Sequence, residues 1–130
     1  MIDNEPPTIQ CPTDITQAND PGECGAIVNY PPPTVNENCP GATSVCSPPS
    51  GSLFPVGTTV VTCTATDAAG NTSAPCSFTV TVNDVEPPTI ICSGNITQGN
   101  DPGVCGAIVN YPPPTVNDNC PGATSVCSPP

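Results

Sequence analysis

The chain of 130 residues repeats itself. Residues 6–49 align without a gap with residues 87–130, and 37 of the 44 aligned positions are identical. The cysteines keep a constant offset of 81 residues, as Cys11 and Cys92 illustrate. Such a period is typical of a tandem array of one structural unit. We therefore predict one complete repeat with its N-terminal linker, residues 1–82, followed by a linker and the first half of a second repeat, residues 83–130.

The second repeat stops before the counterparts of residues 50–82. Half of a β-sandwich would leave strand edges without partners, and such edges are neither stable nor resistant to aggregation. We expect the missing strands to come either from continuing sequence or from a neighbouring chain.

Short runs rich in Val, Ile and Thr alternate with turns of Pro, Gly, Asn and Asp, which is typical of an all-β fold. Alternation along a run indicates one buried and one solvated face. Six or seven short strands in about 81 residues predict an immunoglobulin-like β-sandwich. The predicted strands are Thr8–Cys11, Ile15–Gln17, Cys24–Tyr30, Thr43–Ser47, Thr58–Thr66 and Cys76–Val82. The predicted inward-facing residues are Ala26, Val28, Tyr30, Val61, Cys63, Ala65, Cys76, Phe78, Val80 and Val82.

The charge balance excludes several classes of function. The chain has no Lys, Arg or His and 11 acidic residues. It therefore has no side chain that could neutralise phosphates, which excludes nucleic-acid binding and attachment to anionic lipid. The usual general base is absent, the carboxylates lie in turns, and a repeat of this size leaves little room for a cleft, so we expect no enzyme. No apolar stretch approaches the ~20 residues that span a membrane.

Ten cysteines without a single His or Cys-x-x-Cys motif indicate disulfide bonds rather than a metal cluster or a redox dithiol. Disulfide bonds persist in oxidising compartments. The cysteines thus predict an extracellular or cell-surface protein.

Several phrases of the sequence belong together in one known family. They are Glu86–Cys92 at the start of a repeat, Asn19–Cys24, Asn36–Cys39, Ser50–Thr59 with its FPVGTT, Thr64–Asn71 with its ATDAAGN, and Cys76–Val82. The chain resembles the hyalin repeat (HYR) domain over essentially its whole length. The resemblance implies an immunoglobulin-like fold and a role in extracellular adhesion. It departs from the family in lacking Lys and Arg.

Six cysteines in the complete repeat allow 15 disulfide connectivities. The first and last strands of a sandwich begin at the same end of the domain, which predicts a Cys11–Cys76 bond. The resemblance implies a Cys46–Cys63 bond between facing central strands.

Cys24 and Cys39 remain, and their pairing requires the chain to fold back after Tyr30. In the second repeat the matching bond is Cys105–Cys120, whereas Cys92 and Cys127 would need partners beyond residue 130.

Oxygen-bearing side chains gather in the linkers and loops. One group surrounds the start of the complete repeat: Asp3, Glu5, Asn36, Glu37, Asp67 and Asn71. A second group is expected at the junction of two repeats: Asn19, Asp20, Asn83, Asp84, Glu86, Asn117 and Asp118. Oxygen ligands without nitrogen or sulfur suit Ca²⁺, which makes Ca²⁺ the predicted cofactor. The alternative is that they are solvated turn residues.

Two sequons, at Asn71 and Asn95, are candidate glycosylation sites. Asn71 cannot readily serve both as a glycan site and as a calcium ligand.

Near-identical repeats favour a mechanical role. We predict a non-catalytic extracellular fibre, stalk or surface array in which neighbouring copies of the repeat are the partners and calcium stiffens the junctions. The alternative is a cell-adhesion module that binds a glycan or a protein receptor.

Overall fold

The computed structural model describes residues 3–130, so residues 1 and 2 of the first predicted domain lie outside the described part. The chain forms two compact units, of which unit 1 extends to Val85 and unit 2 covers Glu86–Pro130. Within residues 3–130 no helix has the length and apolar character needed to cross a membrane.

Unit 1 is built from strands that follow the predicted alternation of β-runs and turns. They are β1 (Thr8–Gln10), β2 (Ile15–Ala18), β3 (Gly25–Val28), β4 (Thr34–Asn36), β5 (Thr43–Ser47), β6 (Ser52–Pro55), β7 (Gly57–Thr66) and β8 (Cys76–Asn83). The predicted all-β, disulfide-bonded fold is confirmed.

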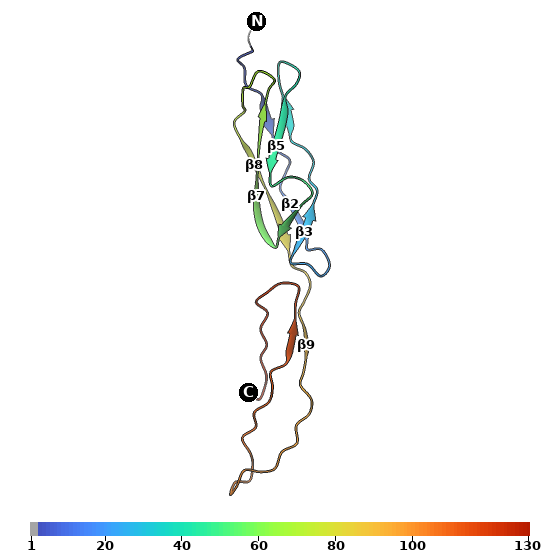
Figure 1. Ribbon diagram of the computed structural model, residues 1–130, viewed down its shortest axis with the longest axis vertical. Coiled ribbons are helices and arrows are strands. Elements are labelled where there is room, and N and C mark those ends of the chain that lie inside the picture. The colour runs from blue at the N-terminus through green and yellow to red at the C-terminus, as the bar shows by residue number, and fades with distance from the viewer. Residues whose placement is uncertain (1–2) are drawn as a thin grey trace. The chain divides into compact units, whose positions relative to one another are not determined.

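The strands of unit 1 form two layers (Figure 1). One layer is the four-stranded sheet β2-β8-β7-β5, in which β2 runs parallel to β8 and the other pairs are antiparallel. The other layer contains the antiparallel pairs β3-β6 and β1-β4. The first strands of the chain therefore contribute to both layers, as in an immunoglobulin-like sandwich.

The core lies between the two layers and is small. Alternate residues of β3, β7 and β8 point inward, as their period-2 pattern requires. The Tyr30 and Phe78 rings pack against each other in a T-shaped arrangement, with ring centroids 5.0 Å apart. The buried apolar residues are Ala26, Val28, Tyr30, Phe54, Val61, Cys63, Ala65, Phe78, Val80 and Val82. Nine of the ten inward-facing residues predicted from the sequence are among them; the tenth, Cys76, is half-buried and packs against this core, and Phe54 is added.

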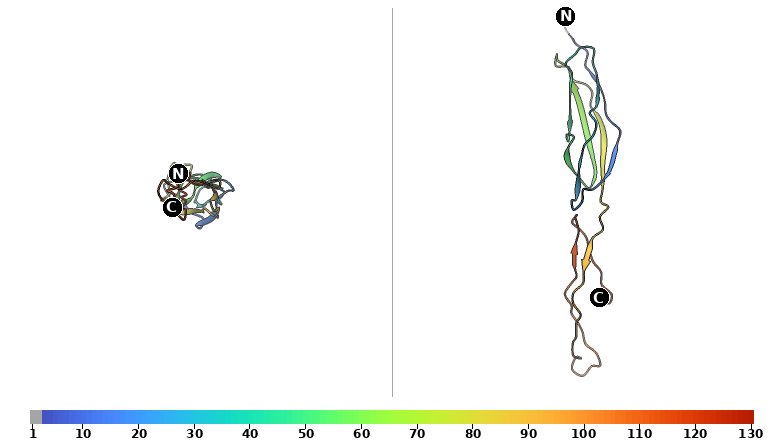
Figure 2. Two further views of the ribbon diagram at one scale, coloured as in Figure 1. Left: turned by 90° about the horizontal axis from the view of Figure 1, so that it is seen from below. Right: turned by 90° about the vertical axis from the view of Figure 1, so that its right-hand side faces the viewer.

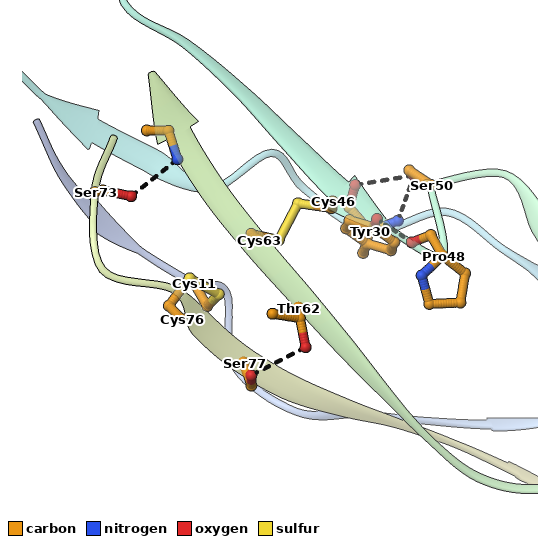
Figure 3. The surroundings of a disulfide bond; sticks show 11 residues. Cys11, Tyr30, Cys46, Pro48, Ser50, Thr62, Cys63, Ser73, Cys76 and Ser77 are labelled. Carbon is orange, nitrogen blue, oxygen red and sulfur yellow. Dashed lines mark hydrogen bonds between the residues drawn. A yellow bond between two sulfur atoms is a disulfide. The ribbon is translucent and has the colours of Figure 1, made fainter. Parts of the chain in front are cut away.

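Tyr30 also forms hydrogen bonds with Pro48 and Ser50, in the segment that precedes β6 (Figure 3). Its hydroxyl donates a 2.6 Å hydrogen bond to the Pro48 carbonyl oxygen, and its backbone N–H donates to Ser50 Oγ at 2.9 Å. The Ser50 hydroxyl in turn donates to the Tyr30 carbonyl oxygen at 3.1 Å. Burial raises the pKa of Tyr30, which keeps the phenol protonated as a donor.

The expected Cys11–Cys76 and Cys46–Cys63 disulfide bonds are both present in unit 1 (Figure 3). Cys11, just after β1, is bonded to Cys76 at the start of β8, so this bond joins the two layers. Cys46 and Cys63 are bonded as well, but the expected placement on facing central strands is wrong. They lie opposite each other on β5 and β7, which are neighbours in one sheet, and β5 is its edge.

The predicted Cys24–Cys39 bond is wrong, because Cys39 is an exposed free thiol. The chain does not fold back after Tyr30. Instead β3 continues through the three prolines into β4, which carries the chain to the opposite end of unit 1 (Figure 1). Cys24 therefore stays at the end where the strand begins, and Cys39 arrives at the end that holds Asp3.

The predicted Cys105–Cys120 bond is wrong for the same reason, because Cys105 is a free thiol. Cys105 follows the turn that contains Asn100 and Val104, whereas Cys120 follows the strand Thr115–Asn117.

Two strands of unit 1 are absent from the sequence-based assignment. Strand β4 directly follows Pro31–Pro33, and β6 ends in Pro55, so both resemble turn segments in composition. Both segments are strands because each pairs with a strand that is distant in the sequence: β4 pairs with β1, and β6 pairs with β3. Proline is tolerated there because each position lies at a strand end or on a sheet edge.

Unit 2 repeats part of this arrangement. Strands β9 (Thr89–Ile91) and β10 (Thr115–Asn117) pair with the same register as β1 and β4, and Figure 2 (right) shows them side by side. The counterparts of β2 and β3 are not strands in unit 2, because in unit 1 these pair with β8 and β6. Ile108 in this region is 80% exposed. The expectation that further strands complete this repeat stays a prediction.

We predict that Tyr30→Phe destabilises unit 1 by about 1 kcal/mol, because it leaves the partly buried Pro48 carbonyl oxygen without its donor. Tyr111→Phe is the matched control: Tyr111 makes the corresponding bond to the Pro129 carbonyl oxygen, but in an exposed setting. Denaturant unfolding of both variants measures the difference. Equal losses in the two variants would contradict this assignment.

Candidate metal centre

Three acidic side chains from distant parts of the sequence meet at one end of unit 1. We call this end the N-terminal pole, and the end that holds Val85 the C-terminal pole. Asp3 comes from the segment before β1, Glu37 follows β4, and Asp67 follows β7. The pairing of β1 with β4 brings Asp3 and Glu37 together. One carboxylate oxygen from each of the three residues lies within 4.8 Å of the others, and we call this set the acidic cluster.

Asp67 is held by the turn that it begins. It is only 5% exposed. The Asn71 backbone N–H donates to Asp67 Oδ1 at 2.7 Å, and Asn71 Nδ2 donates to Oδ2 at 2.8 Å. The turn also requires Gly70, whose φ of +91° is the left-handed region that favours glycine. The sequence Asp67–Asn71 thus fixes a carboxylate by local chemistry alone.

Asp3 is attached to the loops by polar contacts. Asn71 Nδ2 donates to the Asp3 carbonyl oxygen at 3.0 Å, and Asn38 Nδ2 donates to Asp3 Oδ1 at 3.3 Å. The Glu5 backbone N–H donates to the same Oδ1 at 3.1 Å. These bonds join the segment that leads into the repeat to both loops of the N-terminal pole.

The pKa values of the two loop acids of the cluster, Glu37 and Asp67, shift in opposite directions. Burial raises the pKa of Glu37, and the neighbouring Asp67 and Asp3 carboxylates raise it further. For Asp67, burial acts in the same upward direction, but the hydrogen bonds from Asn71 outweigh it and lower the pKa. Glu37 Oε2 is buried and has no hydrogen-bond partner. The cluster therefore holds excess negative charge with one carboxylate oxygen unsatisfied.

This arrangement fits a hard divalent cation. Carboxylate oxygens are the ligands that Ca²⁺ prefers, and no cationic side chain exists to compete for them. Asp3, Glu37 and Asp67 would hold such an ion. The cluster brings together three of the six residues predicted around this pole.

The other three predicted ligands of this pole have different roles. Asn71 acts as a donor to Asp67 and Asp3. Glu5 is exposed and contributes its backbone N–H. Asn36 is exposed on β4, where it pairs with Thr8.

The predicted junction ligands Asn19 and Asp20 serve the turn at the C-terminal pole. Asn19 binds the outgoing chain: its backbone N–H donates to the Asn83 carbonyl oxygen at 2.9 Å, and its Oδ1 accepts from the Val85 N–H at 3.0 Å. Asp20 Oδ2 accepts from the Ile27 N–H at 2.9 Å.

The remaining junction residues divide between the units. Asn83 and Asp84 belong to unit 1, whereas Glu86, Asn117 and Asp118 belong to unit 2. By the 81-residue offset, Asp84 and Asp118 are the counterparts of Asp3 and Glu37. Residues 83–130 contain no position that corresponds to Asp67. The repeat thus supplies counterparts of two of the three cluster acids, Asp84 at the end of unit 1 and Asp118 in unit 2. Within unit 2, Asp118 Oδ1 accepts from the Asn119 N–H at 2.9 Å.

The two sequons differ in their surroundings. Asn71 Nδ2 uses both of its hydrogens, on Asp67 and on the Asp3 carbonyl oxygen, whereas a glycan would replace one of them. Asn95 is exposed.

Two contributors to this pole were missed from the sequence. Asn38 contacts Asp3 across 35 positions of sequence, a pairing that no local pattern announces. Cys39 lies beside the cluster; its side chain is exposed, but partial desolvation of the sulfur and the Asp3, Glu37 and Asp67 carboxylates raise the pKa of its thiol.

Comparison with known proteins places this architecture. The family profile of the HYR domain matches residues 2–82 and again residues 83–129. The chain belongs to the HYR family. It is 37% identical over 131 residues to hyalin of Strongylocentrotus purpuratus, covering 98% of this chain and 11% of that protein. It is 36% identical over 118 residues to hyalin of Lytechinus variegatus, covering 89% of this chain and 22% of that protein.

A rat relative, "Sushi, von Willebrand factor type A, EGF and pentraxin domain-containing protein 1", is 42% identical over 91 residues, covering 68% of this chain and 2% of that protein. The HYR chain thus spans between a fiftieth and about a fifth of the length of these three relatives. No solved structure matches it.

We predict that Asn71→Ala raises the pKa of Asp67 and destabilises unit 1 by roughly 2 kcal/mol, because the two bonds donated by Asn71 Nδ2, to Asp67 Oδ2 and to the Asp3 carbonyl oxygen, are lost. Because the pKa of Asp67 is lower in the folded state than in the unfolded chain, ionised Asp67 stabilises the fold at pH values above its unfolded-state pKa. This contribution is lost as the pH falls through the folded-state pKa. The acid limb of the stability profile should therefore flatten in the variant. Denaturant unfolding against pH measures it. Asn95→Ala, an exposed asparagine in unit 2, is the control and should leave the profile unchanged.

Proposed function

We propose that each HYR repeat of this chain is a non-catalytic extracellular module that binds one calcium ion at its N-terminal pole and stiffens the array there. The acidic cluster carries this proposal. Its three carboxylates come from the incoming segment and from two loops of the sandwich, and one of them has a buried, unsatisfied oxygen. An ion at this place binds the linker to the domain that follows it.

Electrostatics supports a cation at this pole. Like charges a few ångströms apart repel, and their repulsion is strengthened where side chains are shielded from water. Without an ion, Asp3 is pushed away from Glu37 and Asp67. A divalent ion reverses the sign of that interaction, so it converts a linker that is held by a few polar bonds into one that is fixed on both loops.

The extracellular setting supports calcium as the ion. Disulfide bonds such as Cys11–Cys76 persist in oxidising compartments. Extracellular modules bind Ca²⁺ with dissociation constants of about 10⁻⁴–10⁻³ M. At ten times its dissociation constant, Ca²⁺ stabilises the folded unit by about 1.4 kcal/mol.

A second candidate function is adhesion to an uncharged polar ligand such as a glycan. The outer face of sheet β2-β8-β7-β5 supports it. This face carries hydroxyl groups in pairs across β7 and β8, namely Thr58 with Thr81 and Thr62 with Ser77, at 3.2 and 3.3 Å. Retention of the chain on immobilised glycans, abolished by Thr62→Glu, would favour adhesion over a purely mechanical role.

We predict that millimolar Ca²⁺ raises the Tm of unit 1 by roughly 5–10 °C, the shift that corresponds to about 1.4 kcal/mol in a domain of this size. Glu37→Gln should abolish most of that gain. In EDTA the same variant should be more stable than the parent chain, because the raised pKa of Glu37 means that its charge opposes folding once the pH exceeds that pKa.

The matched control is Glu23→Gln, which removes the same charge in the turn between β2 and β3, at the other pole. It should keep the calcium-dependent rise in Tm. Differential scanning calorimetry of the parent chain and the two variants in Ca²⁺ and in EDTA gives all six Tm values. The calcium site is refuted if the parent chain shows no rise, or if Glu37→Gln responds like Glu23→Gln.

The mechanical part of the proposal has its own test. Negative-stain images of the native material should show extended fibres whose curvature increases in EDTA. Compact discrete particles under both conditions would contradict the fibre, whatever the calorimetry shows.

A further inference from the structure

The free thiols of the described residues follow a pattern. They are Cys39, Cys92, Cys105 and Cys127. Cys92 and Cys127 are the counterparts of Cys11 and Cys46, whose partners Cys76 and Cys63 have counterparts only beyond residue 130. By comparison with the complete repeat, Cys92 and Cys127 are therefore free because residues 83–130 do not include the counterparts of Cys76 and Cys63. Cys39 and Cys105 require a different explanation.

Cys24 and Cys39 lie at opposite poles of unit 1. Strand β2 runs parallel to β8 toward the C-terminal pole, with Ala18 beside Asn83. The turn that follows is bound to the outgoing chain through Asn19, and Cys24 stands between this turn and β3. Cys39, in contrast, lies at the N-terminal pole beside Asp3. A single repeat cannot join these two cysteines.

Unit 2, taken by itself, places its own cysteine in the same way. Strand β10 pairs with β9 so that Asn117 lies opposite Thr89, and Cys120 follows three residues later. Thr89 is only three residues into unit 2, which begins at Glu86. Cys120, the counterpart of Cys39, therefore lies at the pole where the chain enters unit 2.

The chain itself limits the distance between these two poles. Asn83, bound to the Asn19 turn, and Thr89, paired with Asn117, are six residues apart. Six residues span at most about 20 Å even when fully extended. A tether of this length gives the two cysteines an effective concentration in the millimolar range.

We propose that successive repeats are joined by a disulfide bond between Cys24 of one repeat and the counterpart of Cys39 in the next, which is Cys120 in this chain. Cys39 would then pair with a preceding repeat and Cys105 with a following one. Every cysteine of the repeat has a stated partner in a continuous array. The bond goes beyond the proposed calcium site and does not depend on it.

Formation of the bond requires an oxidant of the disulfide class. A thiolate of the chain attacks one sulfur of an oxidoreductase disulfide and forms a mixed disulfide. The second thiolate attacks the chain's sulfur in that mixed disulfide and releases the oxidoreductase as a dithiol. One S–S bond forms in the chain and one breaks in the oxidant, and the two thiol protons end on the oxidant's sulfurs.

Peptide mapping without reduction tests the proposal. Trypsin has no site in a chain without Lys or Arg, but proteases that cut before Asp and after Glu do. After free thiols are alkylated, we expect the peptide 24–37, whose only cysteine is Cys24, to be linked to the peptide 118–130. The competing bond within one repeat would link peptide 24–37 to peptide 38–66.

Two single variants sharpen the result. Cys120→Ser should release peptide 24–37, whereas Cys39→Ser should leave the linked pair unchanged. The Cys11–Cys76 bond, recovered in the same digests, shows that unit 1 is folded in both variants. A link from Cys24 to peptide 38–66, an alkylated Cys24 in the parent chain, or a link that survives Cys120→Ser through Cys127 would overturn the proposal. The digests are made in EDTA, so failure of the calcium site cannot affect them.

Discussion

Two disulfide bonds meet at one level of unit 1, and the packing of the sandwich depends on them. Cys63 on β7 lies opposite Cys46 on one side and opposite Cys76 on the other. The sulfur atoms of Cys11, Cys63 and Cys76 lie within 4.8 Å of one another. Aromatic residues make up only 3% of the chain, so the apolar core alone is thin. Each bond stabilises the fold by roughly 2–4 kcal/mol, and the Cys11–Cys76 bond also joins the two layers. The disulfide bonds thus supply stability that larger apolar side chains supply in domains with a bigger core.

The absence of cations governs the rest of the molecule. Acidic side chains find backbone N–H donors instead: Asp14 accepts from Thr79, Asp20 from Ile27 and Asp67 from Asn71. Asp20 and Asp67 hold turns at the two poles of unit 1, whereas Asp14 binds the connection between β1 and β2 to the middle of β8. These carboxylates contribute structure without an ion. Glu37 is different, because its Oε2 is buried without a donor. The acidic cluster is therefore where the charge of the chain is least compensated by its own groups.

The sequence predicted the fold well where local pattern decides it. The inward-facing residues of β3, β7 and β8 follow from period-2 alternation, and the Cys11–Cys76 bond follows from the position of the first and last strands. It failed where long-range pairing decides. Strands β4 and β6 contain or follow prolines and exist because β1 and β3 lie beside them. The error at Cys24 has the same origin, since it came from treating all six cysteines of a repeat as one closed set. The acidic cluster could be predicted only in part from the sequence. Its acids are evident in the loops, but the contact between Asn38 and Asp3 is not.

Repetition changes what a single residue can do. In an isolated domain, a cysteine at one pole without a partner at that pole is an exposed thiol, and an acidic cluster beside a linker is a source of strain. In an array the same two features recur at every junction, because each C-terminal pole is followed after a few residues by an N-terminal pole. In the proposed array, the disulfide bond between repeats fixes which poles stay together, and the proposed calcium ion fixes how freely they move. The first restraint is permanent under oxidising conditions, whereas the second follows the calcium concentration. An array built in this way can soften when calcium is withdrawn and still keep its units in register, so that stiffness is recovered when calcium returns.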